Sequence, residues 1–136
     1  MTNHAIIHTD GGARGNPGPA GIGAVIELNG HTHEFKEFIG TATNNQAEYK
    51  AVILALQKAK ELGAVEVDVF LDSELVQQQL SQVYKVKNAE LQPLFIQCWN
   101  LATSFKKIKY VHIFRNDNKR ADKLVNQVLD EMIQKV

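Results

Sequence analysis

The stretch AIIHTDGGARGNPGPAGIGAVIELNG, residues 5–30, decides how the chain begins to fold. Its first residues place alternate side chains on opposite faces up to Asp10, as in a strand, and two glycines follow at once. Residues 11–23 hold six of the nine glycines and two of the three prolines, which indicates a turn. A second strand is expected over about residues 22–28. The pattern therefore predicts that Asp10 ends the first strand.

The rest of the chain completes a sheet and adds helices to it. The pair Asn29-Gly30 is typical of a tight hairpin. After it we expect, in order, a strand over residues 31–39, a helix over 45–62, a strand over 65–71, a short helix after Ser73, a longer helix over 89–104, a strand over 107–114 and a final helix. Because helical crossovers make the later strands parallel, the predicted fold class is α/β. Its five-stranded mixed sheet joins a three-stranded antiparallel meander to two parallel strands, with helices packed on the sheet.

Length and composition limit the protein class. The 136 residues are the size of one domain, and we expect residues 1–136 to form it. The one cysteine, Cys98, cannot build a disulfide framework within this chain, which favours a cytoplasmic protein. No run approaches the roughly 20 apolar residues of a membrane span, and no basic leader precedes a long apolar core. We therefore expect a soluble protein with no membrane partner.

The charges balance overall but not locally. Fifteen basic and fifteen acidic side chains argue against strong non-specific attraction to a polyanion. Residues 106–123, however, hold seven Lys or Arg against two Asp. This segment is either a solvated face or a shallow patch that faces phosphates.

Four acidic residues stand where a predicted strand or helix meets a polar turn: Asp10, Glu48, Asp72 and Asp122. One such residue alone is often a turn former or a helix cap. Glu48 does not fit that explanation, because helical spacing puts it on the face of Ala51 and Ala55, which packs on the sheet. No Lys or Arg lies on this face. A cation shared with the other carboxylates is the expected partner of Glu48.

The residue types favour one kind of chemistry. Clustered carboxylates repel one another and take up protons unless a divalent metal neutralises them. Ligation by Asp and Glu oxygens alone selects hard ions such as Mg²⁺ or Mn²⁺. Two ions about 4 Å apart could activate a water and stabilise the departing oxygen of a phosphodiester. The sequence predicts ligands, but it does not determine how many ions they hold.

Two polar segments could contact a substrate. The turn GGARGNPGPAG lacks the Gly-Lys-Ser/Thr ending of a P-loop and leads into a strand, so it is not a nucleotide loop of that class. Gly11 would still let a backbone N–H approach a phosphate or sugar closely. Of Thr43, Asn44 and Asn45, one is expected to cap the helix, which leaves the others to bind substrate.

Five segments carry a resemblance to a known family: TDGGARGNPGPAGIGAV, TNNQAEYKAVILAL, DSELV, YKVKN and RADKLVN. Together, in order and with compatible spacing, they resemble the type 1 ribonuclease H family over nearly the whole chain. The chain is similar to its short branch, in which a brief connection such as Tyr84 to Asn88 replaces the helix and basic protrusion of longer members.

The resemblance implies a ribonuclease H-like fold and a metal-dependent endonuclease. Such an enzyme cuts the RNA strand of an RNA–DNA hybrid with Mg²⁺ or Mn²⁺, through two ions per site, and leaves 5′-phosphate and 3′-hydroxyl ends. By the motif positions, Asp10, Glu48, Asp72 and Asp122 would be the catalytic, metal-binding carboxylates. Gly11, Asn16, Asn44 and Asn45 would face the hybrid, Thr43 would help seat a DNA phosphate, and Ser73 would lie near the RNA strand. No obligate protein partner is evident.

Some positions depart from the family pattern. Glu74 stands where many relatives have Gln after Asp-Ser, and it could repel a phosphate. No histidine occupies the segment from Arg115 to Arg120, where longer members carry a loop His, and Arg115 is the candidate substitute. Two other functions therefore stay open: a non-catalytic or very slow module that binds hybrid or double-stranded nucleic acid, and a similar nuclease with other substrates.

Two aromatic residues have competing interpretations. Trp99 lies among apolar residues of the helix over 89–104, and we expect it in the core rather than on the surface as a platform on which bases stack. Tyr84 stands beside Lys85 and Lys87, so it could grip the DNA strand or pack against the shortened loop.

Overall fold

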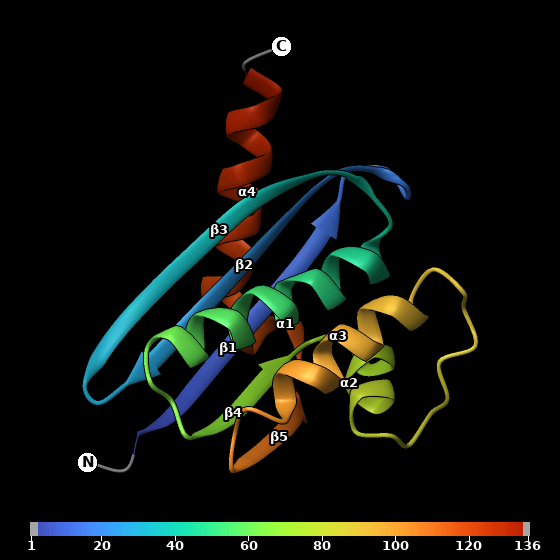
Figure 1. The fold of residues 1–136 in the computed structure, drawn as a ribbon. Helices are drawn as coiled ribbons and strands as arrows, with labels where there is room; N and C mark the ends of the chain where they lie inside the picture. The colour runs from blue at the N-terminus through green and yellow to red at the C-terminus, as the bar shows by residue number, and fades with distance from the viewer. Residues whose placement is uncertain (1–2, 135–136) are drawn as a thin grey trace.

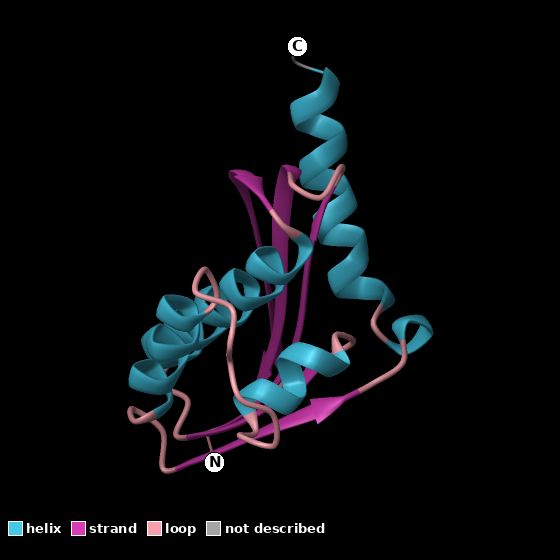
Figure 2. Ribbon diagram, turned by 90° about the vertical axis from the view of Figure 1, so that its right-hand side faces the viewer, coloured by secondary structure: helices cyan, strands magenta, loops and turns pink. Residues whose placement is uncertain are grey.

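The computed structural model describes residues 3–134, which form a mixed sheet with helices on both faces (Figures 1 and 2). The strands are β1 (His4–Ala13), β2 (Gly18–Leu28), β3 (His31–Ala42), β4 (Glu66–Leu71) and β5 (Lys107–His112), in the order β3-β2-β1-β4-β5. The first three pair antiparallel, while β4 runs parallel to both β1 and β5. The predicted α/β fold class with a five-stranded mixed sheet is confirmed.

The first hairpin differs from the prediction. β1 continues through Gly11 and Gly12 to Ala13, and β2 begins at Gly18. Asp10 pairs with Gly23, so it lies inside the strand, and the expected strand end at Asp10 was wrong. The glycines here are strand residues that let helices approach the sheet. Only the short segment between Ala13 and Gly18 makes the turn.

The helices lie in two layers. α1 (Asn44–Glu61), α2 (Glu74–Leu80) and α3 (Gln92–Ala102) cover one face, and α4 (Lys119–Gln134) crosses the other (Figure 2). α3 is shorter than predicted at both ends. β5 ends at His112, after which Ile113 N donates to Leu71 O at 3.0 Å and the chain turns away through a 3₁₀ turn, η1 (Arg115–Asp117), which the pattern did not predict.

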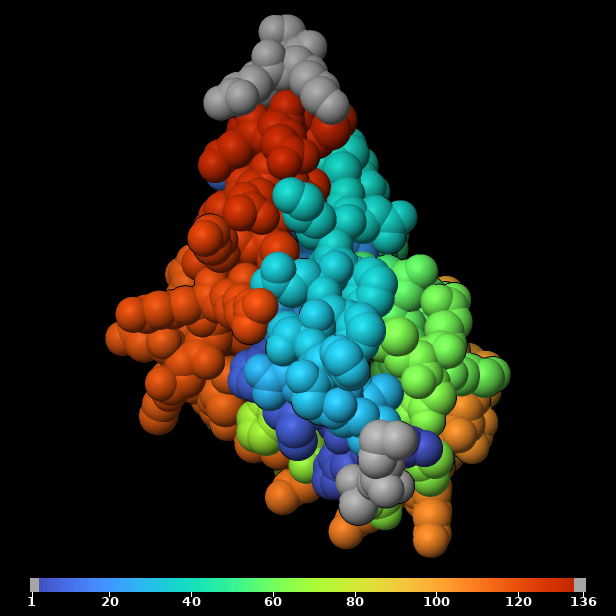
Figure 3. Space-filling model, turned by 90° about the vertical axis from the view of Figure 1, so that its left-hand side faces the viewer, coloured from blue at the N-terminus to red at the C-terminus, as the bar shows by residue number. Residues whose placement is uncertain are grey.

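β3 is an edge strand that lies between α4 and α1 on the face seen in Figure 3. Ion pairs fasten it to α4: Arg120 Nε lies 2.7 Å from Glu34 Oε2, and Lys36 Nζ lies 3.3 Å from Glu131 Oε1. These pairs are solvent-exposed, so each contributes at most about 1 kcal/mol. Charged side chains on this edge strand also discourage pairing with a strand of another molecule.

The main core lies between the sheet and the layer of α1, α2 and α3. Tyr49, Leu56 and Ile7 are among its fully buried side chains. Trp99 is not part of it, because its side chain is 51% exposed, and the expectation of a core position was wrong. The inward stripe of α3 passes through Leu94 and Cys98, four residues apart, and Trp99 falls beside it.

Tyr84 is 50% exposed on the connection between α2 and α3. No helix of the described residues has the length and apolar character needed to cross a membrane.

Glycines on two strands let helices lie close to the sheet. A Cβ on Gly11 would collide with the carbonyl group of Ala47 and come within 2.7 Å of Glu48 N, both in α1. On the other face, a Cβ on Gly23 would lie 2.8 Å from Leu124 Cβ in α4. The absence of these side chains therefore sets the spacing of α1 and α4 from the sheet.

The substitution Gly11→Ala should destabilise the fold, because the added methyl group forces α1 away from β1. Overpacking of this kind costs about 1–3 kcal/mol. Gly12→Ala is the matched control, since a Cβ there meets only Val125 Cγ1 at 3.8 Å. Thermal unfolding followed by circular dichroism should show a clearly lower Tm for Gly11→Ala and a Tm close to wild type for Gly12→Ala. Equal melting temperatures for the two variants would contradict the packing role of Gly11.

Candidate metal centre

Three carboxylates from three elements converge beyond the end of β4. Asp10 lies on β1, Glu48 on α1, and Asp72 directly after β4, and one oxygen of each lies within 4.8 Å of the others. Thr9 of β1 pairs with Leu71 of β4, so the residues that follow them, Asp10 and Asp72, lie next to each other. Because β4 stops at Leu71 while β1 continues, the Asp10 carboxylate meets Asp72 beside the shorter strand.

The position of Glu48 depends on Gly11. α1 comes so close to β1 at this glycine that the Glu48 carboxylate lies beside the backbone N–H of Gly11, whose positive end lowers the pKa of Glu48 and so favours its charged form. Glu48 is only 7% exposed, as is Asp10. The predicted inward face of Glu48 is thus confirmed. Gly11, whose N–H is expected to approach a substrate, therefore also lies beside a protein carboxylate.

Burial and mutual repulsion perturb both inner carboxylates. Burial first, and then the charge of Asp72, raise the pKa of Asp10 to about 7. Burial, followed by the charges of Asp10 and Asp72, raises the pKa of Glu48 well above its ordinary range. Among the described residues, Oε2 of Glu48 is buried without a hydrogen-bond partner.

The donor set fits a divalent cation. A cation at the convergence of Asp10, Glu48 and Asp72 would offset their repulsion and supply the missing partner of Glu48. Carboxylate oxygens alone suit a hard ion such as Mg²⁺ or Mn²⁺ rather than zinc.

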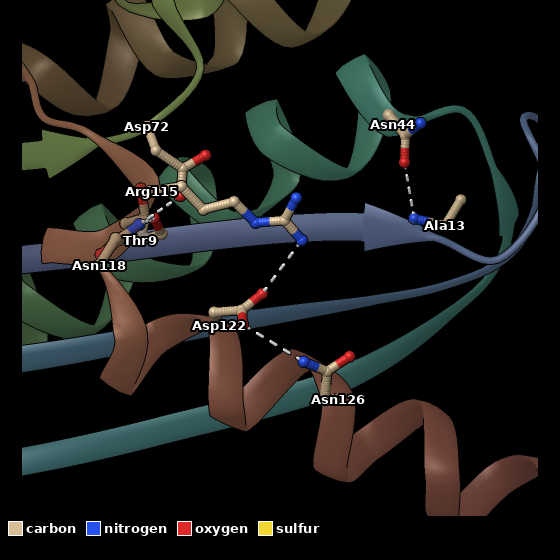
Figure 4. Close-up of polar contacts among 8 residues, drawn as sticks. All are labelled: Thr9, Ala13, Asn44, Asp72, Arg115, Asn118, Asp122 and Asn126. Carbon is tan, nitrogen blue, oxygen red and sulfur yellow. Dashed lines mark hydrogen bonds and ion pairs between the residues drawn. The ribbon is translucent and has the colours of Figure 1, made fainter.

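Asp122 lies at the rim of this cluster. It stands in the first turn of α4, as predicted, but its oxygens are not among the three that lie within 4.8 Å of one another. Its Oδ1 lies 3.9 Å from Arg115 Nη2, and its Oδ2 accepts from Asn126 Nδ2 at 3.4 Å (Figure 4). Asp122 lines the same cavity, and its charge adds to the raised pKa of Asp10, while Arg115, 83% exposed, faces solvent beside it.

Asn118 is a site residue that the sequence interpretation missed. It is 1% exposed, and its Nδ2 donates to Thr9 O at 2.8 Å and to Asp72 Oδ2 at 3.0 Å (Figure 4). It thus connects β1, the end of β4 and the start of α4. The only signal in the sequence was an asparagine directly before a predicted helix, which is equally typical of a cap.

The polar residues around the start of α1 brace one another. Thr43 is the helix cap, with its hydroxyl accepting from Gln46 N at 3.1 Å, so one of the three candidate caps is confirmed. Asn44 Oδ1 accepts from Ala13 N at 2.9 Å (Figure 4), and Asn16 Oδ1 accepts from Asn44 N at 3.0 Å. These bonds join the turn after β1 to α1. Asn45 is half-buried next to them.

Ser73 and Glu74 begin α2 beside the cluster. The Ser73 hydroxyl caps α2 by accepting from Val76 N at 3.3 Å. Glu74 is exposed in the first turn, where the helix dipole favours a carboxylate. A helix-stabilising role therefore explains Glu74 without a substrate.

The cluster opens into a cavity of about 320 Å³ between β1, α1 and α4. Of the predicted site residues, Gly11, Asn44 and Arg115 line it together with the four carboxylates. Asn16, Thr43, Asn45 and Ser73 are not among the lining residues. Arg14, which the sequence interpretation did not single out, also lines it.

The comparisons with known proteins agree on one family. The family model described as reverse transcriptase-like matches residues 8–128. The chain is 46% identical over 132 residues to a bifunctional protein of Mycobacterium tuberculosis, covering 95% of this chain and 36% of that protein. It is 35% identical over 138 residues to the ribonuclease H of Salmonella arizonae, covering 91% of this chain and 88% of that protein. The chain thus spans about a third of the mycobacterial relative and most of the Salmonella one.

A solved structure extends the similarity to three dimensions. A ribonuclease H1 isolated from compost by a metagenomic approach has been solved in complex with an RNA/DNA hybrid. It matches with a TM-score of 0.89 and 46% sequence identity, covering 95% of this chain and 99% of that chain.

The free energy of unfolding should depend on pH, because the carboxylates of the cluster are buried and repel one another. In the absence of divalent metal, folded Asp10 keeps its proton up to a pKa of about 7, whereas an unfolded aspartate loses it near 3.8. Between these values the folded state binds more protons at Asp10, so the contribution of Asp10 to the free energy of unfolding falls as pH rises and levels off above about pH 7. Asp10→Asn removes this decrease in the free energy of unfolding, because asparagine does not ionise.

With a chelator present, Asp10→Asn should therefore be more stable than wild type at pH 8, by on the order of 1–3 kcal/mol, and similar to it at pH 4. Urea unfolding at both values measures the difference. Glu61→Gln, at the exposed end of α1, is the control and should follow wild type. An Asp10→Asn protein that is no more stable than wild type at pH 8 would refute the predicted repulsion.

Proposed function

The chain belongs to the type 1 ribonuclease H family, and from this premise we propose that it is an endonuclease that hydrolyses the RNA strand of RNA–DNA hybrids. The products would carry 5′-phosphate and 3′-hydroxyl ends. The observation that carries the proposal is the carboxylate cluster of Asp10, Glu48 and Asp72, with its partnerless Glu48 oxygen. A structural role explains one buried acid more easily than three together. The hybrid bound to the compost relative supports the substrate class.

The proposed cofactor is Mg²⁺ or Mn²⁺, with two ions per site. Asp10, Glu48 and Asp72 would hold them from the centre, and Asp122 from the rim. Bound there, divalent ions supply an activated water and neutralise the charge that develops on the departing oxygen. The all-oxygen donor set and the raised pKa of Asp10 support this assignment.

Other residues of the chain would orient the site and the substrate. Asn118 holds Asp72 in place, and Arg115 is proposed to contact a phosphate near Asp122. Gly11, Asn16, Asn44 and Asn45 are proposed to face the hybrid, with Thr43 toward a DNA phosphate and Ser73 toward the RNA strand. The hydroxyls of Thr43 and Ser73 accept bonds from their helices, which leaves each hydroxyl proton free to be donated to a phosphate.

Two further assignments accompany this function. We propose that residues 1–136 form one ribonuclease H-like domain, since the family model matches residues 8–128. A cytoplasmic location is supported by the single cysteine, Cys98, which is fully buried.

Incubation of the purified protein with a labelled hybrid tests the proposal. We expect cleavage of the RNA strand with Mg²⁺ or Mn²⁺, and little cleavage of single-stranded RNA, duplex RNA or duplex DNA. Asp10→Asn should lower the rate to below about 1% of wild type, because it removes a metal ligand at nearly constant volume. Glu61→Gln should cleave like wild type. Tight hybrid binding without turnover in either metal would instead favour a binding module, and preferred cleavage of another substrate would indicate a different nuclease.

Asn118 offers a separate test of how the cluster is positioned. Asn118→Ala removes the amide that orients Asp72, so the Mn²⁺ concentration for half-maximal cleavage should rise about 10- to 100-fold. Asn100→Ala, on the exposed side of α3, is the control and should leave the metal requirement unchanged. Circular dichroism at the assay temperature separates this effect from unfolding. A folded Asn118→Ala protein with the metal requirement of wild type would show that Asn118 does not position Asp72.

A further inference from the structure

Arg14 is a cavity residue whose role the proposed chemistry leaves unassigned. Two arginines line the cavity, Arg14 and Arg115. Arg115 lies over Asp122, whereas Ala13, directly before Arg14, lies farther along β1 beside Asn44 (Figure 4). The two arginines therefore reach the cavity from different elements, Arg14 from just after β1 and Arg115 from η1.

The side chain of Arg14 is held in position. Its Nη2 lies 2.6 Å from Asp130 Oδ1 in α4, and its backbone N donates to Pro19 O at 2.9 Å. The pair is open to solvent, with the side chains of Arg14 and Asp130 38% and 60% exposed. Such a pair contributes at most about 1 kcal/mol to stability, so fold stability alone is a weak reason for it.

A guanidinium held in this way can still bind another anion. Arginine has five N–H donors in a planar fork, and the contact with Asp130 uses one nitrogen. The remaining donors match the spacing of two phosphate oxygens. Asp130 thus orients the group at the cavity wall without saturating it.

We propose that Arg14 binds a backbone phosphate of the nucleic-acid substrate, away from the bond that is cut, and that Asp130 is its positioning residue. This inference rests on the proposed function. Arg14 follows Asp10 by four residues, and the three between them are extended strand, which separates the two Cα atoms by roughly 13 Å. The phosphate that Arg14 binds is therefore a different one from the scissile phosphate. Arg14 sets how the substrate lies along the cavity.

Hybrid binding in an Asp10→Asn background tests this without turnover. Adding Arg14→Gln should weaken binding about 10-fold and reduce the slope of log Kd against log salt by about one, as expected for one lost phosphate contact. Arg14→Lys should keep the salt slope and recover part of the affinity. Lys36→Gln is the matched control, because Lys36 also pairs with a carboxylate of α4, Glu131, at a similar exposure, and it lies on β3, outside the cavity. It should bind like the parent.

Neutral methylphosphonate linkages placed one at a time identify the phosphate and its strand. The parent should lose affinity at one position in the RNA or the DNA strand, and Arg14→Gln should be insensitive there. Equal losses for both proteins at every position, or equal weakening by Arg14→Gln and Lys36→Gln, would overturn the role of Arg14. Wild type that cleaves hybrids would leave the proposed function intact in that case. A parent that binds no hybrid, together with wild type that cleaves none, would overturn both.

Discussion

The close approach of α1 to β1 at Gly11 is the constraint on which the rest of the site depends. With no side chain at this position, the backbone of Ala47 and Glu48 packs directly on the strand, and the Glu48 carboxylate is buried beside Asp10. A larger residue would move the helix outward and separate the two carboxylates. Asp72 joins them because β4 ends one residue before it, next to a strand that continues. A backbone contact thus creates a concentration of negative charge that the fold does not neutralise by itself.

The helix on the other face of the sheet, α4, helps to position these carboxylates. α4 packs on the other face of the sheet, close to Gly23, and the residue just before the helix sends its amide to Asp72 and to the backbone of β1. The same helix carries Asp122 and Asp130, one near each of the two arginines of the cavity. The site therefore combines elements from both faces of the sheet. Asp10, Glu48 and Asp122 stand on packed strands and helices, and Asp72, which directly follows β4, is held by Asn118. The carboxylates therefore cannot move apart easily to relieve their repulsion.

Sequence patterns predicted the parts of this arrangement that follow from periodicity. Helical spacing placed Glu48 on the buried face, and alternation placed Asp72 at a strand end. Spacing is less informative where the same residue type is typical of two different structures. The glycines after Asp10 were interpreted as a turn, although they are strand residues under a helix, so the end of β1 was wrong. Trp99 lies next to the buried apolar stripe of α3 and not within it. The composition of the helix alone does not separate these two positions. Asn118 was missed because its bonds to Thr9 and Asp72 join residues 109 and 46 positions apart.

The balance of charge makes local placement decisive for substrate binding. A chain with fifteen basic and fifteen acidic residues has no net attraction for a polyanion, and an empty carboxylate cluster would repel the phosphate that has to approach it. In the proposed enzyme, metal binding removes that repulsion, and Arg14 and Arg115 then present positive charge at the cavity wall. Metal and hybrid are coupled ligands in this scheme. If bound metal raises the affinity for the hybrid by some factor, then bound hybrid raises the affinity for the metal by the same factor. Substrate would therefore help to assemble the metal site that cuts it, without any change in the fold.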